Sequence, residues 1–299
     1  MIRIDRILCP VDHSEISRRA LEYAAVLAKR YEAALRVVEV VPIGLPSVDY
    51  PPAPAEFALT PDQQNAHVVA LEAFVAPVLG AGVPVETRVH GGYIVEQLLL
   101  EAEQYAPDLI VLGTHGRSGV QRLVLGSVAE KVLRRATCPV LTVPPGAQGP
   151  PEAIELPKTI LCAVDFSDAS LRALEYAMSV AQESDAELVL MHVVDWAAET
   201  WAAGTHGVML TAYTESRTAE AERLLGEAVP VPAREWCKPE ILVTEGKPWR
   251  QILRVARERA ADLIVLGVLG RGAVDLTLFG STTHHIVREA PCPVLTVRA

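Results

Sequence analysis

Apolar residues in the first half of the chain form short runs that alternate with helical stripes. Residues 5–11 are an apolar run without clean polar alternation, which is typical of a strand covered on both faces. After Ser14, a residue type that caps helices, apolar side chains recur at helical spacing. The same alternation predicts strands at 34–41, 83–89, 108–113 and 139–143, and helices at about 62–80, 93–105 and 127–136.

The second half shows the same order of elements. Strands are expected near 158–164, 186–194, 240–244, 262–267 and 293–298, with helices between them. Strands that alternate with helices favour a parallel sheet with right-handed crossovers. We therefore expect an α/β fold in which each half is a five-stranded, doubly wound domain, with any ligand beyond the carboxyl ends of its strands.

The two halves also share sequence. Ile7-Leu8-Cys9-Pro10-Val11-Asp12 returns as Ile160-Leu161-Cys162-Ala163-Val164-Asp165, and Asp108-Leu-Ile-Val-Leu-Gly113 returns as Asp262-Leu-Ile-Val-Leu-Gly267. The offset of 153 or 154 residues is about the size of a whole domain. The sequence predicts two tandem domains, residues 1–146 and 155–299, joined by a Pro- and Gly-rich linker.

Composition and charge exclude several classes of protein. No apolar stretch approaches the roughly 20 residues that span a bilayer, and Arg3, Asp5 and Arg6 interrupt the place of a signal segment. We expect a cytoplasmic chain without a membrane partner. The net charge is −10, with 13 Lys and Arg against 16 Asp and Glu in residues 1–150 and 14 against 21 in residues 151–299. Neither half is basic, so a nucleic-acid partner is not expected.

Cysteines and irregular segments add little chemistry. Five cysteines occur without a Cys-x-x-Cys, as expected for small buried side chains in a reducing compartment, and Cys237, which has no repeat partner, is the candidate for an exposed thiol.

The segment 42–61 contains six prolines, and its counterpart near 195–210 contains Trp196 and Trp201. Each is either a lid over a ligand or a plain surface connection.

A glycine motif follows the fourth strand of each half. One half has Gly113 and Gly116 and then Gly126-Ser127, the other has Gly267 and Gly270 and then Gly280-Ser281, and both fit G-x2-G-x9-G-[ST]. Such glycines let the backbone approach a ligand, and Gly-Ser opens a helix whose free amides and dipole favour a phosphate. Arg117 and Arg271 can pair with its oxygens. The alternative is that the glycines serve only a turn and a close helix–sheet contact.

Asp12 ends the first strand of the first half, and Asp165 ends that of the second half. Each is therefore expected at the carboxyl edge of its own predicted sheet, where the glycine motif also lies. A carboxylate there can accept hydrogen bonds from a base amino group or a ribose hydroxyl. Alternatively it caps the following helix, a role for which Ser14 and Ser167 compete.

These residues resemble the universal stress protein family, in particular its ATP-binding branch, over nearly all of both halves. The resemblance implies a Rossmann-like sheet of order 3-2-1-4-5 with ATP across the strand ends, and Mg²⁺ can accompany the phosphates. By resemblance, the adenine contacts are Asp12 and Val40 with Pro10 and Val11 beside them, the ribose contacts are Leu112 and Gly113, and the phosphate contacts are His115, Gly116, Gly126, Ser127 and Val128. The corresponding positions of the second half are Ala163, Val164, Asp165, Val193, Leu266, Gly267, Gly270, Gly280, Ser281 and Thr282.

The halves depart from the family pattern in different ways. A histidine frequent after the first glycine is kept as His115 but is Leu269 in the second half, and a hydroxyl residue near the helix start is missing at Ala129 but present as Thr283. We therefore expect two nucleotide sites of unequal affinity. No candidate catalytic base or nucleophile occurs in both halves. His284 and His285 are neighbours on a helix, where adjacent side chains point about 100° apart, so no metal site is expected there.

The leading interpretation is a nucleotide-dependent regulatory protein of the stress response with at most slow ATP hydrolysis. The alternatives are an ATPase or nucleotidyl-transferring enzyme that uses His115 or Asp12, and a scaffold whose glycines are structural. In the family the last strand mediates dimerisation, so the strands at 139–143 and 294–297 are expected to pair the two halves as an internal pseudo-dimer. Association of further chains stays open, as do the stress, the partner and the choice among ATP, ADP and cyclic nucleotides.

Overall fold

The chain forms two compact units, residues 3–154 and residues 155–299. The computed structural model describes residues 2–43, 59–79, 82–115, 125–147, 156–195, 208–235, 237–268 and 280–298. The predicted boundaries at 146 and 155 stay predictions, because residues 148–155 lie outside the described part. The same holds for most of the two segments that were expected to be lids or surface connections, since 44–58 and 196–207 are not described.

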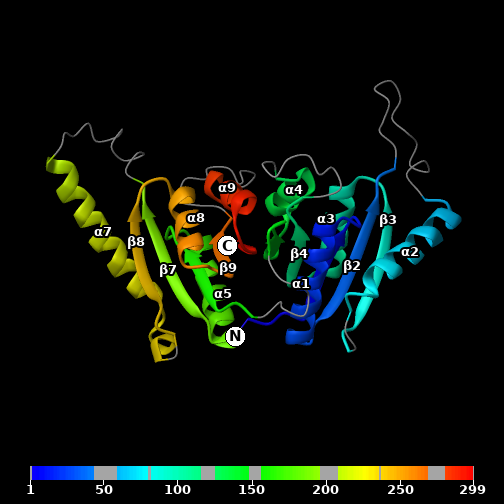
Figure 1. The fold of residues 1–299 in the computed structure, drawn as a ribbon, viewed down its shortest axis with the longest axis horizontal. Coiled ribbons are helices and arrows are strands. Elements are labelled where there is room, and N and C mark those ends of the chain that lie inside the picture. The colour runs from blue at the N-terminus through cyan, green and yellow to red at the C-terminus, as the bar shows by residue number, and fades with distance from the viewer. Residues whose placement is uncertain are drawn as a thin grey trace, which may run out of the picture. The chain divides into compact units, whose positions relative to one another are not determined.

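The first unit is a parallel sheet with strands in the order β3-β2-β1-β4-β5, which confirms the expected order 3-2-1-4-5. Each strand except the last leads through a crossover segment to the next (Figure 1). Its elements are β1 (Arg6–Val11), α1 (Glu15–Tyr31), β2 (Ala34–Val41), α2 (Pro61–Val75), β3 (Val85–Gly91), α3 (Ile94–Tyr105), β4 (Leu109–Gly113), α4 (Ser127–Arg135) and β5 (Val140–Val143).

The second unit repeats this topology, with the order β8-β7-β6-β9-β10 and parallel pairing throughout. Its helix before the edge strand, α7, is longer than α2, and a short 3-10 helix, η3, follows it. The elements are β6 (Thr159–Ala163), α5 (Asp168–Ser184), β7 (Glu187–Val194), α7 (Val208–Ala228), η3 (Val231–Glu235), β8 (Glu240–Glu245), α8 (Pro248–Glu258), β9 (Leu263–Gly267), α9 (Ser281–Glu289) and β10 (Val294–Val297).

The two halves start their first helix with the same cap. The Ser17 amide donates to Ser14 Oγ at 3.1 Å, and the Ser170 amide donates to Ser167 Oγ at 3.3 Å. Each cap satisfies one of the amides that a helix start leaves open. The predicted helix starts at 127 and 281 are confirmed as well, since α4 begins at Ser127 and α9 at Ser281.

The central strands supply the core of each unit. Ile7, Leu8 and Cys9 of β1 are at most 1% exposed, and so are their counterparts in β6. This burial on both faces explains why these strands lack polar alternation. Helix α1 packs on β1 and β4, and α5 packs in the same way on β6 and β9.

Strand β2 carries charged side chains to both faces of the first sheet. Arg36 and Glu39 are an odd number of residues apart, so their side chains point to opposite faces. Arg36 contacts Glu101 on α3, whereas Glu39 contacts His67 on α2. Helices α2 and α3 therefore cover opposite faces of this sheet.

Two expectations about local structure are wrong. Helix α2 ends at Val75 rather than near residue 80, because Pro77 has no amide proton to donate to the turn before it. Cys237 is not an exposed thiol: it is 7% exposed, and burial raises the pKa of its thiol. Among the described residues, no helix is long and apolar enough to cross a membrane.

Candidate functional site

The carboxylates of Asp12 and Asp165 hold the turn that leads into the first helix of each unit. Asp12 Oδ1 accepts from the Ser14 amide at 3.0 Å, and Asp165 Oδ1 accepts from the Ser167 amide at 3.1 Å and from its hydroxyl at 2.6 Å. The intervening residues have a left-handed backbone, with φ of 62° at His13 and 63° at Phe166. The helix caps themselves come from the serines, so each aspartate braces the cap rather than replacing it.

The first glycine of each motif lies against a helix. A Cβ on Gly113 would lie 2.6 Å from Ile16 Cγ2, and a Cβ on Gly267 would lie 2.8 Å from backbone atoms of Ala169 and Ser170. Real Cβ contacts are not this short, so glycine is needed at both positions for strand–helix packing alone. This favours the structural interpretation of these two glycines, and a role in ligand approach stays a prediction.

The last glycine of each motif starts a helix at the carboxyl end of the fourth strand. Gly126 is the N-cap of α4, and its amide donates to the Thr114 carbonyl, which directly follows β4, at 2.9 Å. Gly280 caps α9 in the same way, and among the described residues no side chain caps either helix. A helix start leaves its first amides without an intrahelical acceptor, here from Ser127 and Ser281 onward, and such amides can bind an anion.

The two helix starts differ in their polar surroundings. In the first unit Thr114 Oγ1 lies 2.9 Å from His115 Nδ1, so the threonine orients the imidazole. Val268 stands where the first unit has Thr114. In the second unit Thr283, 3% exposed, donates from its hydroxyl to the Gly267 carbonyl at 3.2 Å, so this hydroxyl ties α9 to β9.

Most predicted adenine and ribose contacts lie at the ends of neighbouring strands. Pro10 and Val11 end β1, Val40 lies in β2 and Leu112 in β4, and the second unit repeats the arrangement. Most of the apolar side chains are buried, so only their backbone is available to a ligand; this holds for Val11, Val40, Leu112, Val164 and Leu266. Half-buried positions are Pro10, Ala163, Val128, Val193 and Thr282, whereas Ser127 and Ser281 are exposed. Gly116, Arg117, Gly270, Arg271 and Leu269 lie outside the described residues.

The second unit has a pocket at the carboxyl ends of β6 and β7. Its volume is about 250 Å³, less than the pockets that enclose whole drug-sized ligands, so it has room for part of a nucleotide. Two of its residues, Asp165 and Val193, were predicted from the family resemblance. The full lining is Asp165, Phe166, His192, Val193, Val194, Asp195, Arg217, Glu220, Ala221, Leu224 and Pro248.

Two rings form part of that lining. His192 Nδ1 lies 2.7 Å from the Val164 carbonyl, and its ring lies 4.8 Å from that of Phe166, tilted by 36°. The charged lining is mostly acidic, because Asp165, Asp195 and Glu220 outnumber Arg217. A hydrogen bond from Arg223 lowers the pKa of Glu220, which keeps this carboxyl ionised at neutral pH. The pocket therefore suits a ring that donates hydrogen bonds better than it suits a phosphate.

In the first unit a buried carboxylate lies near the corresponding place. Glu39 is 5% exposed; its Oε1 lies 3.2 Å from His67 Nδ1, and its Oε2 lies 3.2 Å from His13 Nε2. The His13 ring also contacts the Phe74 ring, at 4.8 Å. The guanidinium of Arg18 lies over Phe74 and donates to its carbonyl at 3.3 Å. This group, His13, Arg18, Glu39, His67 and Phe74, is called the Glu39 cluster below.

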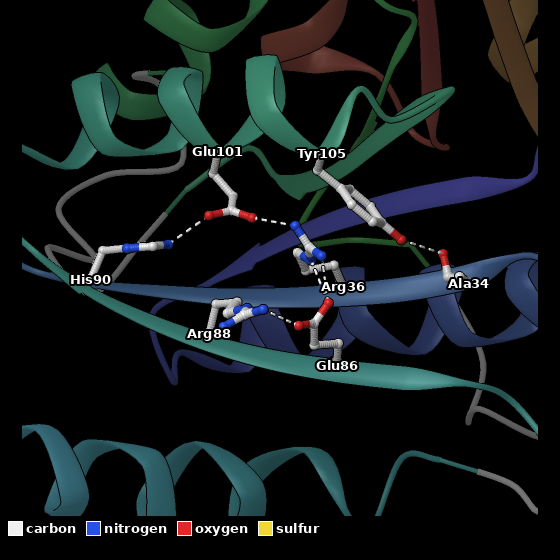
Figure 2. Close-up of polar contacts among 7 residues, drawn as sticks. All are labelled: Ala34, Arg36, Glu86, Arg88, His90, Glu101 and Tyr105. Carbon is white, nitrogen blue, oxygen red and sulfur yellow. Dashed lines mark hydrogen bonds and ion pairs between the residues drawn. The ribbon is translucent and has the colours of Figure 1, made fainter.

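A second charged network lies on the α3 face of the same sheet (Figure 2). Arg36 donates to Glu101 at 2.7 Å and through two nitrogens to Glu86, and Glu101 Oε2 lies 2.7 Å from His90 Nε2. The Arg36 guanidinium also lies 3.9 Å from the centre of the Tyr105 ring. The hydrogen bond from Arg36 lowers the pKa of Glu86. The network joins β2, β3 and α3, and the second unit has Val189, Thr244 and Val255 in place of Arg36, His90 and Glu101.

Sequence reasoning missed both the Glu39 cluster and this network. A signal was present, because Arg36 and Glu39 interrupt a strand that is otherwise apolar, and a buried charge needs a partner. Within the described residues, no group of three or more His, Cys, Asp or Glu side chains has an arrangement that could hold a metal ion.

Comparison with known proteins places both halves in one family. The profile of the Universal stress protein family matches residues 3–144 and again residues 157–298. A universal stress protein of Thermus aquaticus is 36% identical over 145 residues, which cover 47% of this chain and 98% of that protein. A universal stress protein of Mycobacterium tuberculosis strain H37Rv is 28% identical over 98% of this chain and 94% of its own length.

Solved structures resemble the whole chain. The crystal structure of a universal stress protein from Archaeoglobus fulgidus matches with a TM-score of 0.67 and 24% identity, covering 99% of this chain and 97% of that one. The structure of a functionally unknown protein from Pseudomonas aeruginosa matches with the same TM-score, 19% identity and coverage of 99% and 92%. At these identities the likeness concerns the fold.

Proposed function

Because the chain belongs to the universal stress protein family, with one family domain in each half, we propose that it acts in the stress response by binding an adenine nucleotide, ATP in the first instance. Nucleotide occupancy then changes the conformation or the partners of the chain, with at most slow hydrolysis. The base lies beside the carboxyl ends of the first two strands of a unit, and the phosphates lie at the helix start after the fourth strand.

One observation carries this proposal: helices α4 and α9 both start at a glycine beside the end of a central strand, and no side chain in the described part of the chain caps them. The amides of Ser127 and Ser281 open these first turns, where the helix dipole adds to their attraction for phosphate. The pocket of the second unit supports the proposal independently, since its rings and carboxylates fit an amino-bearing base. The residues present thus fit an adenine nucleotide, and Mg²⁺ would be held mainly by its phosphates.

The experiment is to denature freshly purified protein and identify any released nucleotide by its mass. The matching solution test is thermal unfolding with and without millimolar ATP, because a ligand that binds only the folded chain raises the midpoint. The same experiments with ADP and cyclic AMP decide which nucleotide is preferred. If the denatured protein releases no nucleotide, and no nucleotide at millimolar concentration raises the midpoint, the proposal is wrong.

A scaffold without a nucleotide is the second candidate. It is favoured by the close contacts of Gly113 with Ile16 and of Gly267 with Ala169 and Ser170, which explain these glycines without a ligand. The two candidates differ in one measurement. A scaffold keeps the same melting temperature at every nucleotide concentration, whereas a nucleotide-binding protein does not.

A further inference from the structure

The two halves carry different side chains at the same two places in the fold. His13 and Phe166 directly follow the aspartate that follows the first strand, and both have the same left-handed backbone. Glu39 and His192 occupy matching positions in the second strand, opposite Val89 and Val243 of the edge strand. The backbone is thus shared, and only the chemistry of the side chains differs.

In the second half these positions border open space. Phe166 and His192 line the pocket of about 250 Å³ together with Asp165, Arg217 and Glu220. The His192 ring is fixed through its Nδ1 on the Val164 carbonyl, so it forms a preformed wall beside Phe166. Two tilted rings next to carboxylates are a suitable environment for a planar base with an amino group.

In the first half the same positions make contacts with the protein itself. His13 lies against both Glu39 and the Phe74 ring, and Glu39 also contacts His67 of α2. Arg18 of α1 covers Phe74 from a further side. The Glu39 cluster thus joins the turn after β1 to β2, α1 and α2 through side-chain contacts.

Opening that place to a nucleotide would be unfavourable. Glu39 is 5% exposed; its Oε1 is hydrogen-bonded to His67, its Oε2 lies 3.2 Å from His13 Nε2, and Arg18 lies over the neighbouring Phe74 ring. A base that displaced His67 would leave the buried carboxylate without this hydrogen bond, and a triphosphate would add negative charge nearby. The second half carries no such cost at His192.

We propose that the chain takes up one nucleotide, with its base in the Phe166–His192 pocket of the second half, while the Glu39 cluster closes the corresponding place in the first half. This inference rests on the proposed function and assigns it to one half. The charged groups that face the closed place are Asp12 and His13 after β1, Arg18 of α1, Glu39 of β2 and His67 of α2. The first half then binds no nucleotide, because its own side chains occupy the corresponding place.

The test exchanges residues that the chain already uses at matching positions. Titration calorimetry with ATP should give one equivalent for the unmodified chain. The double variant Phe166→His with His192→Glu should weaken that binding by about tenfold or more. The triple variant His13→Phe, Glu39→His and His67→Ala should gain a second equivalent. The matched control is Glu86→Gln, on the opposite face of the first sheet, which should bind like the unmodified chain.

A footprint on the unmodified chain keeps the test independent of variant folding. Hydrogen exchange with and without ATP should show protection at β6, β7 and α7 and none at β1, β2 and α2. Two equivalents in the unmodified chain, or protection of α2, would overturn the inference while leaving the proposed function intact. Absence of ATP binding by every variant at millimolar concentration would instead overturn the proposed function, and the pocket assignment with it.

Discussion

Ile16 on α1 fills the space beside Gly113 at the end of β4, so that a Cβ on this glycine would lie 2.6 Å from Ile16 Cγ2. Backbone atoms of Ile16 are 3.3 Å from that Cβ position, whereas a Cβ on Gly267 would lie only 2.8 Å from backbone atoms of Ala169 and Ser170. A side-chain methyl can shift, whereas a helix backbone cannot do so cheaply. The chain should therefore tolerate an added Cβ at Gly113 better than at Gly267.

Gly267→Ala is expected to destabilise the chain more than Gly113→Ala. Overpacking of this kind costs about 1–3 kcal/mol, and we expect Gly113→Ala near the lower end of that range and Gly267→Ala near the upper end. Urea denaturation of both variants measures the difference. Gly146→Ala is the control, since no atom lies within 4 Å of a Cβ there. Equal stability of all three variants would contradict this account of the packing.

Asp165→Asn separates a structural role from a ligand role. The amide keeps an oxygen that can accept from the Ser167 amide, so the free energy of unfolding should change by less than about 0.5 kcal/mol. A base amino group would lose its charged acceptor, so ATP affinity should fall about tenfold. Asp12→Asn is the matched control and should leave ATP affinity unchanged. A loss of stability without a change in affinity would assign Asp165 to the turn alone.

The ion pair of Glu86 with Arg36 predicts a stability difference that depends on pH. The pKa of Glu86 is lowered in the folded chain, mainly by the hydrogen bond from Arg36, so its contribution is present above the ordinary glutamate pKa and is lost as the pH falls through the folded value. The Glu86 side chain is 43% exposed, so screening limits the effect. Glu86→Gln should cost about 0.5 kcal/mol at pH 7.

The measurement is chemical denaturation of Glu86→Gln and the unmodified chain between pH 7 and pH 3. Their difference should shrink towards zero at the acid end, because both side chains are then neutral. Arg254 and Glu258 are both exposed and pair within α8, so Glu258→Gln is a control for an ordinary surface pair. A difference for Glu86→Gln that grows on acidification would show that the sign of the linkage is wrong.

The cysteines of the folded chain are expected to resist alkylation. Burial raises the pKa of Cys138 to about 11 and that of Cys292 to about 12, and Cys237 is 7% exposed. At pH 8 a thiol of pKa about 11 holds about 200-fold less thiolate than an ordinary one. Iodoacetamide with mass spectrometry should therefore label the five cysteines quickly only after denaturation. Rapid labelling of Cys138 in the folded chain would contradict this.

The sequence was sufficient for the elements and the topology but not for the side-chain clusters. Strand β1 and its copy β6 were recognised because burial on both faces leaves a continuous apolar run. The starts of α4 and α9 were placed correctly because Gly-Ser marks both. The end of α2 was placed too late, since the effect of Pro77 on the preceding turn was not taken into account.

The charges of Arg36 and Glu39 indicated that partners exist, but no sequence pattern indicated which distant residues those partners are. His67 meets Glu39 because α2 crosses one face of the sheet at a particular height, and sequence spacing does not encode that height. Glu101 meets Arg36 and His90 for the same kind of reason on the other face. The position of the candidate pocket was anticipated through Asp165 and Val193, but its rings and its α7 wall were not. The pairing of the two halves through their final strands stays a prediction.

The ionic network around Arg36 has a consequence for the stability of the chain at low pH. Glu86 loses its charge as the pH falls through its lowered pKa, and its pair with Arg36 is then lost; in the second half Val189 stands in place of Arg36, and the matching Glu240 pairs with Arg259 instead. Because that pKa lies below the ordinary glutamate value, the Glu86–Arg36 pair persists at mildly acidic pH and is lost only in strong acid. Duplication has thus kept one backbone while one copy holds a charged guanidinium inside its strand–helix layer and the other holds an aliphatic side chain there.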